Sequence, residues 1–127
     1  MYPTDRHYTK DHEWVLVQDN AATVGITDFA QDQLGDIVFV EIAEKGKQVE
    51  QGEVLGSIES VKAVSEIYAP ISGTVVEVND GLDQAPETVN SSPHDEGWYC
   101  KLEIAKPDEL AELMDAAAYE ALVASAS

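Results

Sequence analysis

The stretch ESVKAVSEIYAP contains the side chain with the clearest chemical potential in this sequence, the amine of Lys62. Lys62 is the only lysine or arginine between Lys47 and Lys101, and its neighbours are Val61 and Ala63. A turn between two strands normally uses Gly, Asn, Asp or Pro, so a Val-Lys pair is unexpected there. Lys62 is therefore either an ordinary surface lysine or an amine that the turn exposes for a chemical purpose.

Other reactive groups in the chain do not form a recognisable catalytic set. The sequence has no GxSxG motif, P-loop or Rossmann fingerprint. His7, His12 and His94 lie far apart and lack the spacing of metal ligands. Cys100 is the only cysteine, and its place in the apolar run WYCKLEI predicts a buried core residue. Dithiol chemistry would need an attached cofactor, and the pattern favours a carrier over an enzyme.

Period-2 alternation and short apolar runs dominate residues 12–79 and 97–104 and predict a mainly β fold. HEWVLVQ and AATVGIT flank Asp19-Asn20 and predict a hairpin. DIVFVEIA has apolar residues on both faces, which predicts a central strand. The similar units VEQGEVLGSI and ISGTVVEVN, on either side of Lys62, would place this lysine at the tip of a hairpin. We expect a barrel-like sandwich of two small sheets.

Helix signals occur in two places. TDFAQDQLG predicts a short helix over residues 28–34, in which Asp28 and Gln31 resemble a capping box and Gly35 ends the helix. Pro107 and the apolar spacing after it predict a C-terminal helical segment over about 107–124, with Asp115 as an internal cap. GLDQAPETVNSSPHDEG predicts an irregular polar loop. The length of the chain predicts a single domain over residues 1–127.

The net charge of −18 excludes several classes of partner. Nucleic acid and anionic membrane surfaces would repel the chain, so we expect neither as a partner. The acidity serves solubility, steers partners that have basic faces, or reflects adaptation to high salt. The polar start MYPTDRHYTKDHEW lacks the features of a secretory signal or a transit peptide, and no apolar run is long enough to span a bilayer. We expect a cytoplasmic monomer.

Several ordered blocks of the sequence resemble the H-protein of the glycine cleavage system. They cover roughly residues 7 to 123, and in order they are HEWV, GITDFAQDQLGDIVFVE, ESVKAVSEIYAPISGTVVEVN, ETVNSSP, GWYCKLEI and the closing DEL…L…YEAL. HEWV with GITDFAQDQLGD discriminates best, because lipoyl and biotinyl domains share the hairpin lysine. The resemblance implies a lipoyl-domain-like barrel-sandwich hybrid with a short helix and C-terminal helices.

The resemblance also implies a covalent cofactor and a set of partners. Lys62 would carry lipoate as N6-lipoyllysine, attached by a lipoate ligase or lipoyltransferase. A pyridoxal-phosphate glycine decarboxylase (P-protein) would load the aminomethyl group of glycine. An aminomethyltransferase (T-protein) would pass the one-carbon unit to tetrahydrofolate, and dihydrolipoyl dehydrogenase (L-protein) would reoxidise the dithiol. The chain would be a carrier and would not itself be an enzyme.

In the family the loaded arm folds into a cleft, with the carboxylate of the HEW motif as its chief contact. That role carries over to Glu13. Neighbouring cleft positions fall on Asp11, Gln33 and Glu66, near Ile26, whereas family members have Ser, His and Asp at the first three. Glu66 keeps the negative charge on a longer stem, and Gln33 keeps only hydrogen bonding.

Two other functions stay open at the level of the sequence. A lipoyl-relay protein that supplies 2-oxoacid dehydrogenase acyltransferases would have the same fold and the same lysine. A biotinyl carrier domain would share the hairpin, but such hairpins resemble one another in having methionine on both sides of the lysine. Val61 and Ala63 occupy those positions here.

Overall fold

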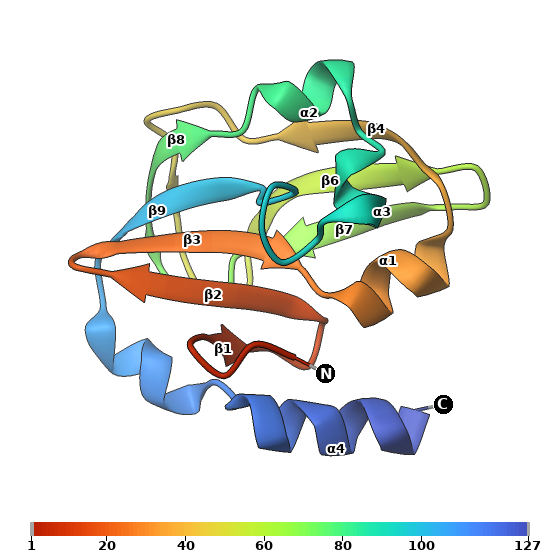
Figure 1. The fold of residues 1–127 in the computed structure, drawn as a ribbon. Coiled ribbons are helices and arrows are strands. Elements are labelled where there is room, and N and C mark those ends of the chain that lie inside the picture. Colours follow the sequence, from red (N-terminus) through yellow and green to blue (C-terminus); the bar gives the residue numbers. More distant parts are fainter. Residues whose placement is uncertain (1, 127) are drawn as a thin grey trace.

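Two antiparallel β-sheets with short helices around them make up the fold (Figure 1). The structure is a computed structural model that describes residues 2–126. Its strands are β1 (His7–Tyr8), β2 (Glu13–Gln18), β3 (Ala21–Ile26), β4 (Ile37–Ile42), β5 (Gln48–Val49), β6 (Val54–Ser60), β7 (Val64–Tyr68), β8 (Gly73–Val78) and β9 (Cys100–Ile104). Its helices are α1 (Asp28–Leu34), α2 (Gly81–Gln84), α3 (Thr88–Ser91), the 3₁₀ helix η1 (Pro107–Glu112) and α4 (Ala116–Ala126).

The larger sheet has the strand order β1-β2-β3-β9-β8-β5, and the smaller sheet has the order β4-β6-β7. The β2–β3 hairpin forms at Asp19-Asn20 as predicted, with Asp19 in the left-handed region at φ 57°. Such a conformation suits Asp or Asn in a tight turn. The predicted mainly β fold with two small sheets is confirmed.

The main core fills the space between the two sheets. Its buried members are Val15, Ala22, Val24, Ile26, Ile37, Val40, Val49, Leu55, Ile58, Ile67, Ala69, Ile71, Val75, Leu82, Val89, Tyr99, Cys100, Leu102 and Ile104. The sheets approach closely at Gly56, where a Cβ atom would collide with the Tyr99 hydroxyl and the Glu41 carbonyl oxygen. That hydroxyl donates a hydrogen bond to the same carbonyl, so only glycine fits at position 56.

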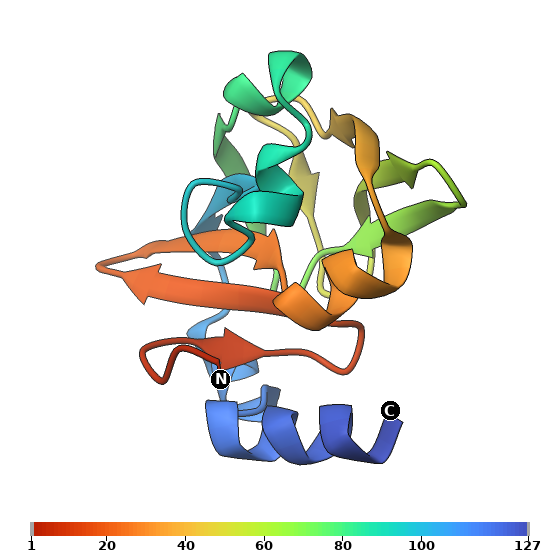
Figure 2. The same ribbon diagram turned by 45° about the vertical axis from the view of Figure 1, so that its right-hand side comes forward.

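A second apolar cluster joins the C-terminal segment to the outer face of the larger sheet. The rings of Tyr8 and Tyr119 stack with their centroids 4.9 Å apart, and both belong to the same cluster as the buried Trp14. Tyr8 and Met114 exchange two backbone hydrogen bonds of 2.8 and 2.9 Å, so the chain before α4 extends the edge of the sheet. Figure 2 shows α4 lying along this side, away from the β6–β7 hairpin.

The short helix over residues 28–34 is present, but its cap differs from the predicted one. Thr27 is the N-cap, and its hydroxyl accepts a hydrogen bond from the backbone N–H of Ala30. Asp28 is the first helical residue and accepts from the Gln31 side chain. Gly35 ends the helix at φ +83°, as predicted. Asp115 accepts from the N–H of Ala118 and so caps α4 as predicted.

Two other predictions about single elements were wrong. DIVFVEIA, which contains β4, lies at an edge of the smaller sheet and not at its centre. Residues 81–97, predicted to be irregular, contain α2 and α3, each anchored by one buried apolar residue, Leu82 and Val89. Within residues 2–126 no helix is both long and apolar enough to cross a membrane.

Candidate functional site

The β6–β7 hairpin presents Lys62 at its tip, as the sequence predicted. The buried Ser60 organises the turn, because its hydroxyl oxygen accepts hydrogen bonds from the backbone N–H groups of Lys62 (3.1 Å) and Ala63 (3.0 Å). The N–H of Ser60 also donates to the carbonyl of Ala63 at 2.8 Å. A serine side chain therefore supplies the turn hydrogen bonds, which explains how this turn tolerates Val-Lys.

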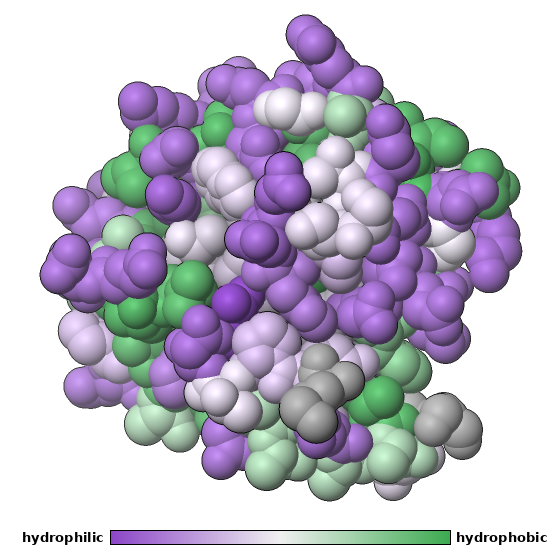
Figure 3. Space-filling model, in the orientation of Figure 1, coloured by the Kyte–Doolittle hydropathy of each residue, from purple (hydrophilic) through white to green (hydrophobic). Residues whose placement is uncertain are grey.

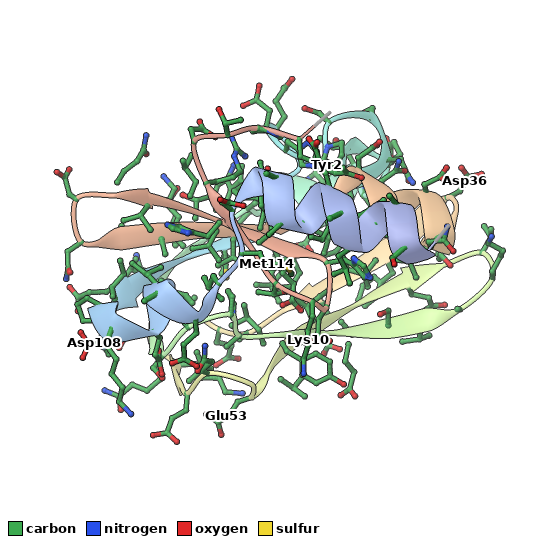
Figure 4. All side chains as sticks on the ribbon, turned by 90° about the horizontal axis from the view of Figure 1, so that it is seen from below. Tyr2, Lys10, Asp36, Glu53, Asp108 and Met114 are labelled. Atoms are coloured by element: carbon green, nitrogen blue, oxygen red, sulfur yellow. The ribbon has the colours of Figure 1, made fainter. Side chains whose placement is uncertain are left out.

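The side chain of Lys62 is exposed and lies against the end of α1. A Cβ atom at Gly35 would be 3.0 Å from Cε of Lys62, so the lysine stem rests where Gly35 lacks a side chain. The N–H of Val61 donates to the carbonyl of Asp36 at 3.0 Å and ties the hairpin tip to the start of β4. Figure 4 shows Asp36 beside this tip. Among residues 2–126, no Asp or Glu oxygen lies within 4.0 Å of the Lys62 ammonium nitrogen.

A cleft of about 530 Å³ opens between the β1–β2 turn, the end of β7 and the chain around η1. It is lined by Tyr8, Thr9, Lys10, Asp11, Glu13, Gln51, Gly52, Tyr68, Ala69, Pro70, Glu112, Leu113 and Met114. In Figure 4, Lys10 and Met114 mark this region, between η1 and the β6–β7 hairpin. Three carboxylates and one amine line the cleft, so it suits a small cationic group better than an anion.

Glu13 is the buried carboxyl group of this cleft, with a relative exposure of 2%. Its Oε2 accepts a hydrogen bond from the backbone N–H of Tyr68 at 2.9 Å, and its Oε1 accepts one from the Thr9 hydroxyl at 3.0 Å. Burial raises the pKa of Glu13 to about 7, although these two hydrogen bonds oppose the shift, and the nearby Asp11 raises it slightly further. A cation that entered the cleft would stabilise the charged carboxylate and displace its proton.

The β1–β2 turn holds Glu13 in place. The Thr9 hydroxyl oxygen accepts hydrogen bonds from the backbone N–H groups of Asp11 and Glu13, both at 3.2 Å. His12 adopts the left-handed conformation at φ 69°, and its Nδ1 lies 2.8 Å from the Tyr119 hydroxyl. The turn that carries Glu13 is therefore fixed to α4 as well as to β2.

The structure brings together only part of the residue set predicted for the cleft. Asp11 and Glu13 both line it. Ile26 pairs with Glu13 across β2 and β3, but it is buried and does not line the cleft. Glu66 lines a separate hollow of about 310 Å³ with Glu41 and Lys47. Gln33 is exposed on α1 and does not line the Glu13 cleft.

Several residues of the cleft were missed from the sequence. Thr9 and Glu112 are polar residues in irregular or 3₁₀ segments, where no periodicity indicates which side chains face inward. The N–H of Tyr68 and the wall formed by Leu113 and Met114 come from segments that only the tertiary fold brings to Glu13. The HEWV block was the one available signal, through its resemblance to the H-protein family.

Redox and metal chemistry have no centre of their own in the described residues. Cys100 is buried as predicted, and burial raises the pKa of its thiol to about 12. Residues 2–126 hold no group of three or more His, Cys, Asp or Glu side chains arranged for a metal ion. Fold and site together define a small two-sheet β domain that displays a lysine on a hairpin and keeps a buried carboxylate in a cleft.

Comparisons with known proteins place this domain in a family. The sequence model described as "Glycine cleavage H-protein" matches residues 6–126. The chain is 55% identical over 121 residues to the glycine cleavage system H protein of Anaeromyxobacter sp. (strain K), covering 95% of this chain and 94% of that protein. It is 54% identical to the H protein of Thermotoga maritima over 115 residues, covering 91% of this chain and 93% of that protein.

A solved structure agrees with these relatives. The crystal structure of a glycine cleavage system H protein from Mycobacterium marinum matches with a TM-score of 0.88 and 39% sequence identity, over 94% of this chain and 97% of that one. The chain belongs to the glycine cleavage H-protein family, which confirms the resemblance seen in its sequence blocks.

Proposed function

We propose that this protein is the lipoyl carrier of a glycine cleavage system, with lipoate joined by an amide bond to Nζ of Lys62. The observation that carries the proposal is the exposed Lys62, held by Ser60 at the tip of a hairpin in a chain of this family. The site fits a covalently attached group, because the lysine stem is exposed and its amine has no carboxylate close by within residues 2–126.

When attached, lipoate would supply a cyclic disulfide, a redox group that the single buried Cys100 cannot provide. The residues of the chain have simpler tasks. Lys62 anchors the arm, and the Glu13 cleft shelters its cargo, the aminomethyl group derived from glycine. That cargo carries an amine that is cationic near neutral pH, and Glu13 would balance the charge. Asp11 lies in the same cleft and would add to the negative potential there.

Gln33, Glu66 and Ile26 take different places in this proposal. Glu66 and Gln33 are exposed on β7 and α1, the two elements that join or contact the Lys62 hairpin, and would meet the arm outside the cleft. Ile26 would act only by fixing Glu13 across the β2–β3 ladder.

The same proposal includes the partners implied by the family. The carrier would meet a pyridoxal-phosphate glycine decarboxylase, an aminomethyltransferase that uses tetrahydrofolate, and dihydrolipoyl dehydrogenase. It would act as a monomer and as their shared substrate, with no catalysis of its own. The single-domain organisation and the cytoplasmic location stay predictions.

Intact mass of the protein purified from its own host tests the attachment. We expect one lipoyl increment on the parent, located on Lys62 by peptide mapping, and none on Lys62→Arg, which keeps the positive charge but offers no acylatable amine. A lipoyl increment on Lys62→Arg would contradict the assignment, and a biotinyl increment on the parent would identify a biotin carrier instead. Loading by glycine decarboxylase separates the carrier from a lipoyl-relay protein, which this enzyme would leave unloaded.

A further inference from the structure

Large apolar side chains gather on the surface around Lys62. Of the six large hydrophobic side chains that are exposed in residues 2–126, four lie here, Val38 (48% exposed), Phe39 (51%), Val61 (66%) and Val64 (67%). We call these four residues the tip patch. Figure 3 shows hydrophobic side chains among hydrophilic ones at the right-hand edge of the molecule, where Figure 1 places the β6–β7 hairpin. An exposed apolar group of this kind in an otherwise acidic surface indicates an interaction site.

A β-bulge in β4 creates half of the tip patch. Ile37 pairs with Ser60 and Phe39 pairs with Glu59, so β4 has one extra residue, Val38, at this point of the ladder. Without the bulge, Val38 and Phe39 would alternate between the buried and the exposed face. With it, both side chains reach solvent. A bulge that exposes two neighbouring apolar residues adds nothing to the core, and bulges often re-aim side chains at functional sites.

The other half of the patch shares the same face. Phe39, Glu59 and Val64 are direct neighbours across β4, β6 and β7, which places their side chains in one row on the outer surface of the smaller sheet. The hydrogen bond from Val61 to Asp36 holds the hairpin tip against the start of β4. The patch therefore lies on one face of the smaller sheet and at the hairpin tip, with Glu59 between Phe39 and Val64.

Acidic side chains lie within the patch and beside it. Asp36, Glu41, Glu59 and Glu66 are all exposed on β4, β6 and β7 or beside them. An apolar face that also carries negative charges fits a partner whose binding surface combines apolar side chains with Lys and Arg.

We propose that the tip patch is the docking surface for the enzyme that attaches lipoate to Lys62, an inference that rests on the function proposed above. That enzyme joins Nζ to the carboxyl carbon of a lipoyl-adenylate, and AMP leaves as the carbon–oxygen bond to it breaks. Its active site must surround Nζ, and so it must contact the base of the lysine. Enzymes that act on the dithiolane ring work at the far end of the attached arm and have no such requirement.

The test measures kcat/KM for acylation of the full-length apo protein by a lipoate ligase with ATP and lipoate. Phe39→Ser should lower kcat/KM about tenfold, mainly through KM, because an anchor residue of the interface is lost. Val64→Thr keeps the shape of the side chain and should cost about threefold. Val76→Thr is the matched control, since Val76 is exposed on β8 in the other sheet, and it should behave like the parent.

Two further measurements separate the possible results. Prolonged acylation should bring Phe39→Ser to full lipoylation. Dihydrolipoyl dehydrogenase, run in reverse with NADH as the reductant, should then reduce its lipoyl disulfide at the parental rate. Glu59→Lys reverses the charge between Phe39 and Val64 and should also slow acylation about tenfold. An unchanged rate would overturn the basic side chains inferred for the partner.

Equal kcat/KM values for the parent, Phe39→Ser and Val64→Thr would overturn the docking surface while leaving the carrier function intact. Unchanged acylation together with slower loading by glycine decarboxylase would assign the patch to that enzyme and overturn this proposal. A parent protein that the ligase does not acylate at all would overturn the carrier function and this inference together.

Discussion

At the scale of single residues, Glu13 combines burial with a charge and so makes stability depend on pH. Its pKa is about 7 in the folded protein and 4.5 by the reference value. A carboxyl group whose pKa is higher in the folded than in the unfolded protein contributes its full stabilisation below the unfolded pKa. This contribution is lost as the pH rises through the folded pKa. The charged carboxylate would stabilise a bound cationic cargo. In the empty protein, burial of the same charge lowers the free energy of unfolding.

We predict that Glu13→Gln flattens this pH dependence. Between about pH 4.5 and pH 8, the parent should lose up to roughly 3 kcal/mol of unfolding free energy relative to the variant, since one pKa unit is about 1.4 kcal/mol. Urea unfolding of both proteins at the two pH values measures the difference, and other titrating groups cancel in the comparison. Parallel pH profiles would show that Glu13 titrates at its reference value.

The same variant tests whether Glu13 shelters the cargo. A charge-assisted hydrogen bond in a sheltered site is worth about 1.5–3 kcal/mol, so its loss should speed release of ammonia from the loaded carrier by about tenfold or more. The variant should still accept lipoate, because the Lys62 hairpin is a separate element. Ammonia release over time, without the aminomethyltransferase, is the measurement. Equal decay of parent and variant would remove Glu13 from this role.

At the scale of elements, the β6–β7 turn depends on one serine. Ser60→Ala removes the acceptor for two backbone N–H groups and should cost about 1–2 kcal/mol of unfolding free energy. Amide exchange at Lys62 and Ala63 should increase, because both groups lose their partner. Ser57→Ala, the same change further from the tip on β6, is the control. Exchange at the tip that stays at the parental rate would show that the backbone alone holds the turn.

The elements also show where sequence reasoning succeeds and where it stops. Alternation predicts strands because it reports which faces can be buried, and the β2–β3 hairpin followed from Asp19-Asn20. Alternation does not report which strands are neighbours, and so β4 was predicted to be central although it is an edge strand. Its apolar residues on both faces result from a bulge, which a sequence pattern cannot distinguish from two-sided burial. The four-residue helices α2 and α3 are too short for any periodicity.

Some features of the candidate site could likewise be predicted from the sequence, and others could not. Lys62 stood out as the only basic residue between Lys47 and Lys101, whereas the role of Glu13 came from the resemblance to the H-protein family. The burial of Glu13 could not be predicted, because it depends on Tyr68 at a distance of 55 positions in the chain and on the segment around Met114. Gln33 and Glu66 were placed beside Glu13 by analogy, and neither lines its cleft.

At the scale of the whole molecule, the dominant property is an excess of negative charge. The chain has 25 acidic and 7 basic side chains, so most carboxylates have no basic side chain to pair with. Within residues 2–126 the ion pairs are Arg6–Asp5, Lys101–Glu77 and Lys106–Glu50. Such a surface produces a long-range field that can attract partners with basic faces.

We predict that association with glycine decarboxylase slows as salt rises. The Debye length falls from about 10 Å at 0.1 M to about 3 Å at 1 M, and electrostatic steering weakens accordingly. Stopped-flow association rates across this range measure the effect, and sucrose at matched osmolality controls for solvent changes. A rate that stays flat across the range would leave solubility or salt adaptation as the reason for the acidity.

The contact between Tyr8 and Met114 has a consequence for the order of events while the chain is being made. Synthesis runs from the N-terminus, and a domain generally folds as a unit. The β6–β7 hairpin with Lys62 leaves the ribosome well before residues 113–114, which form one wall of the Glu13 cleft and complete the edge of the larger sheet. The anchor for the arm is therefore synthesised before the residues that complete the shelter for its cargo.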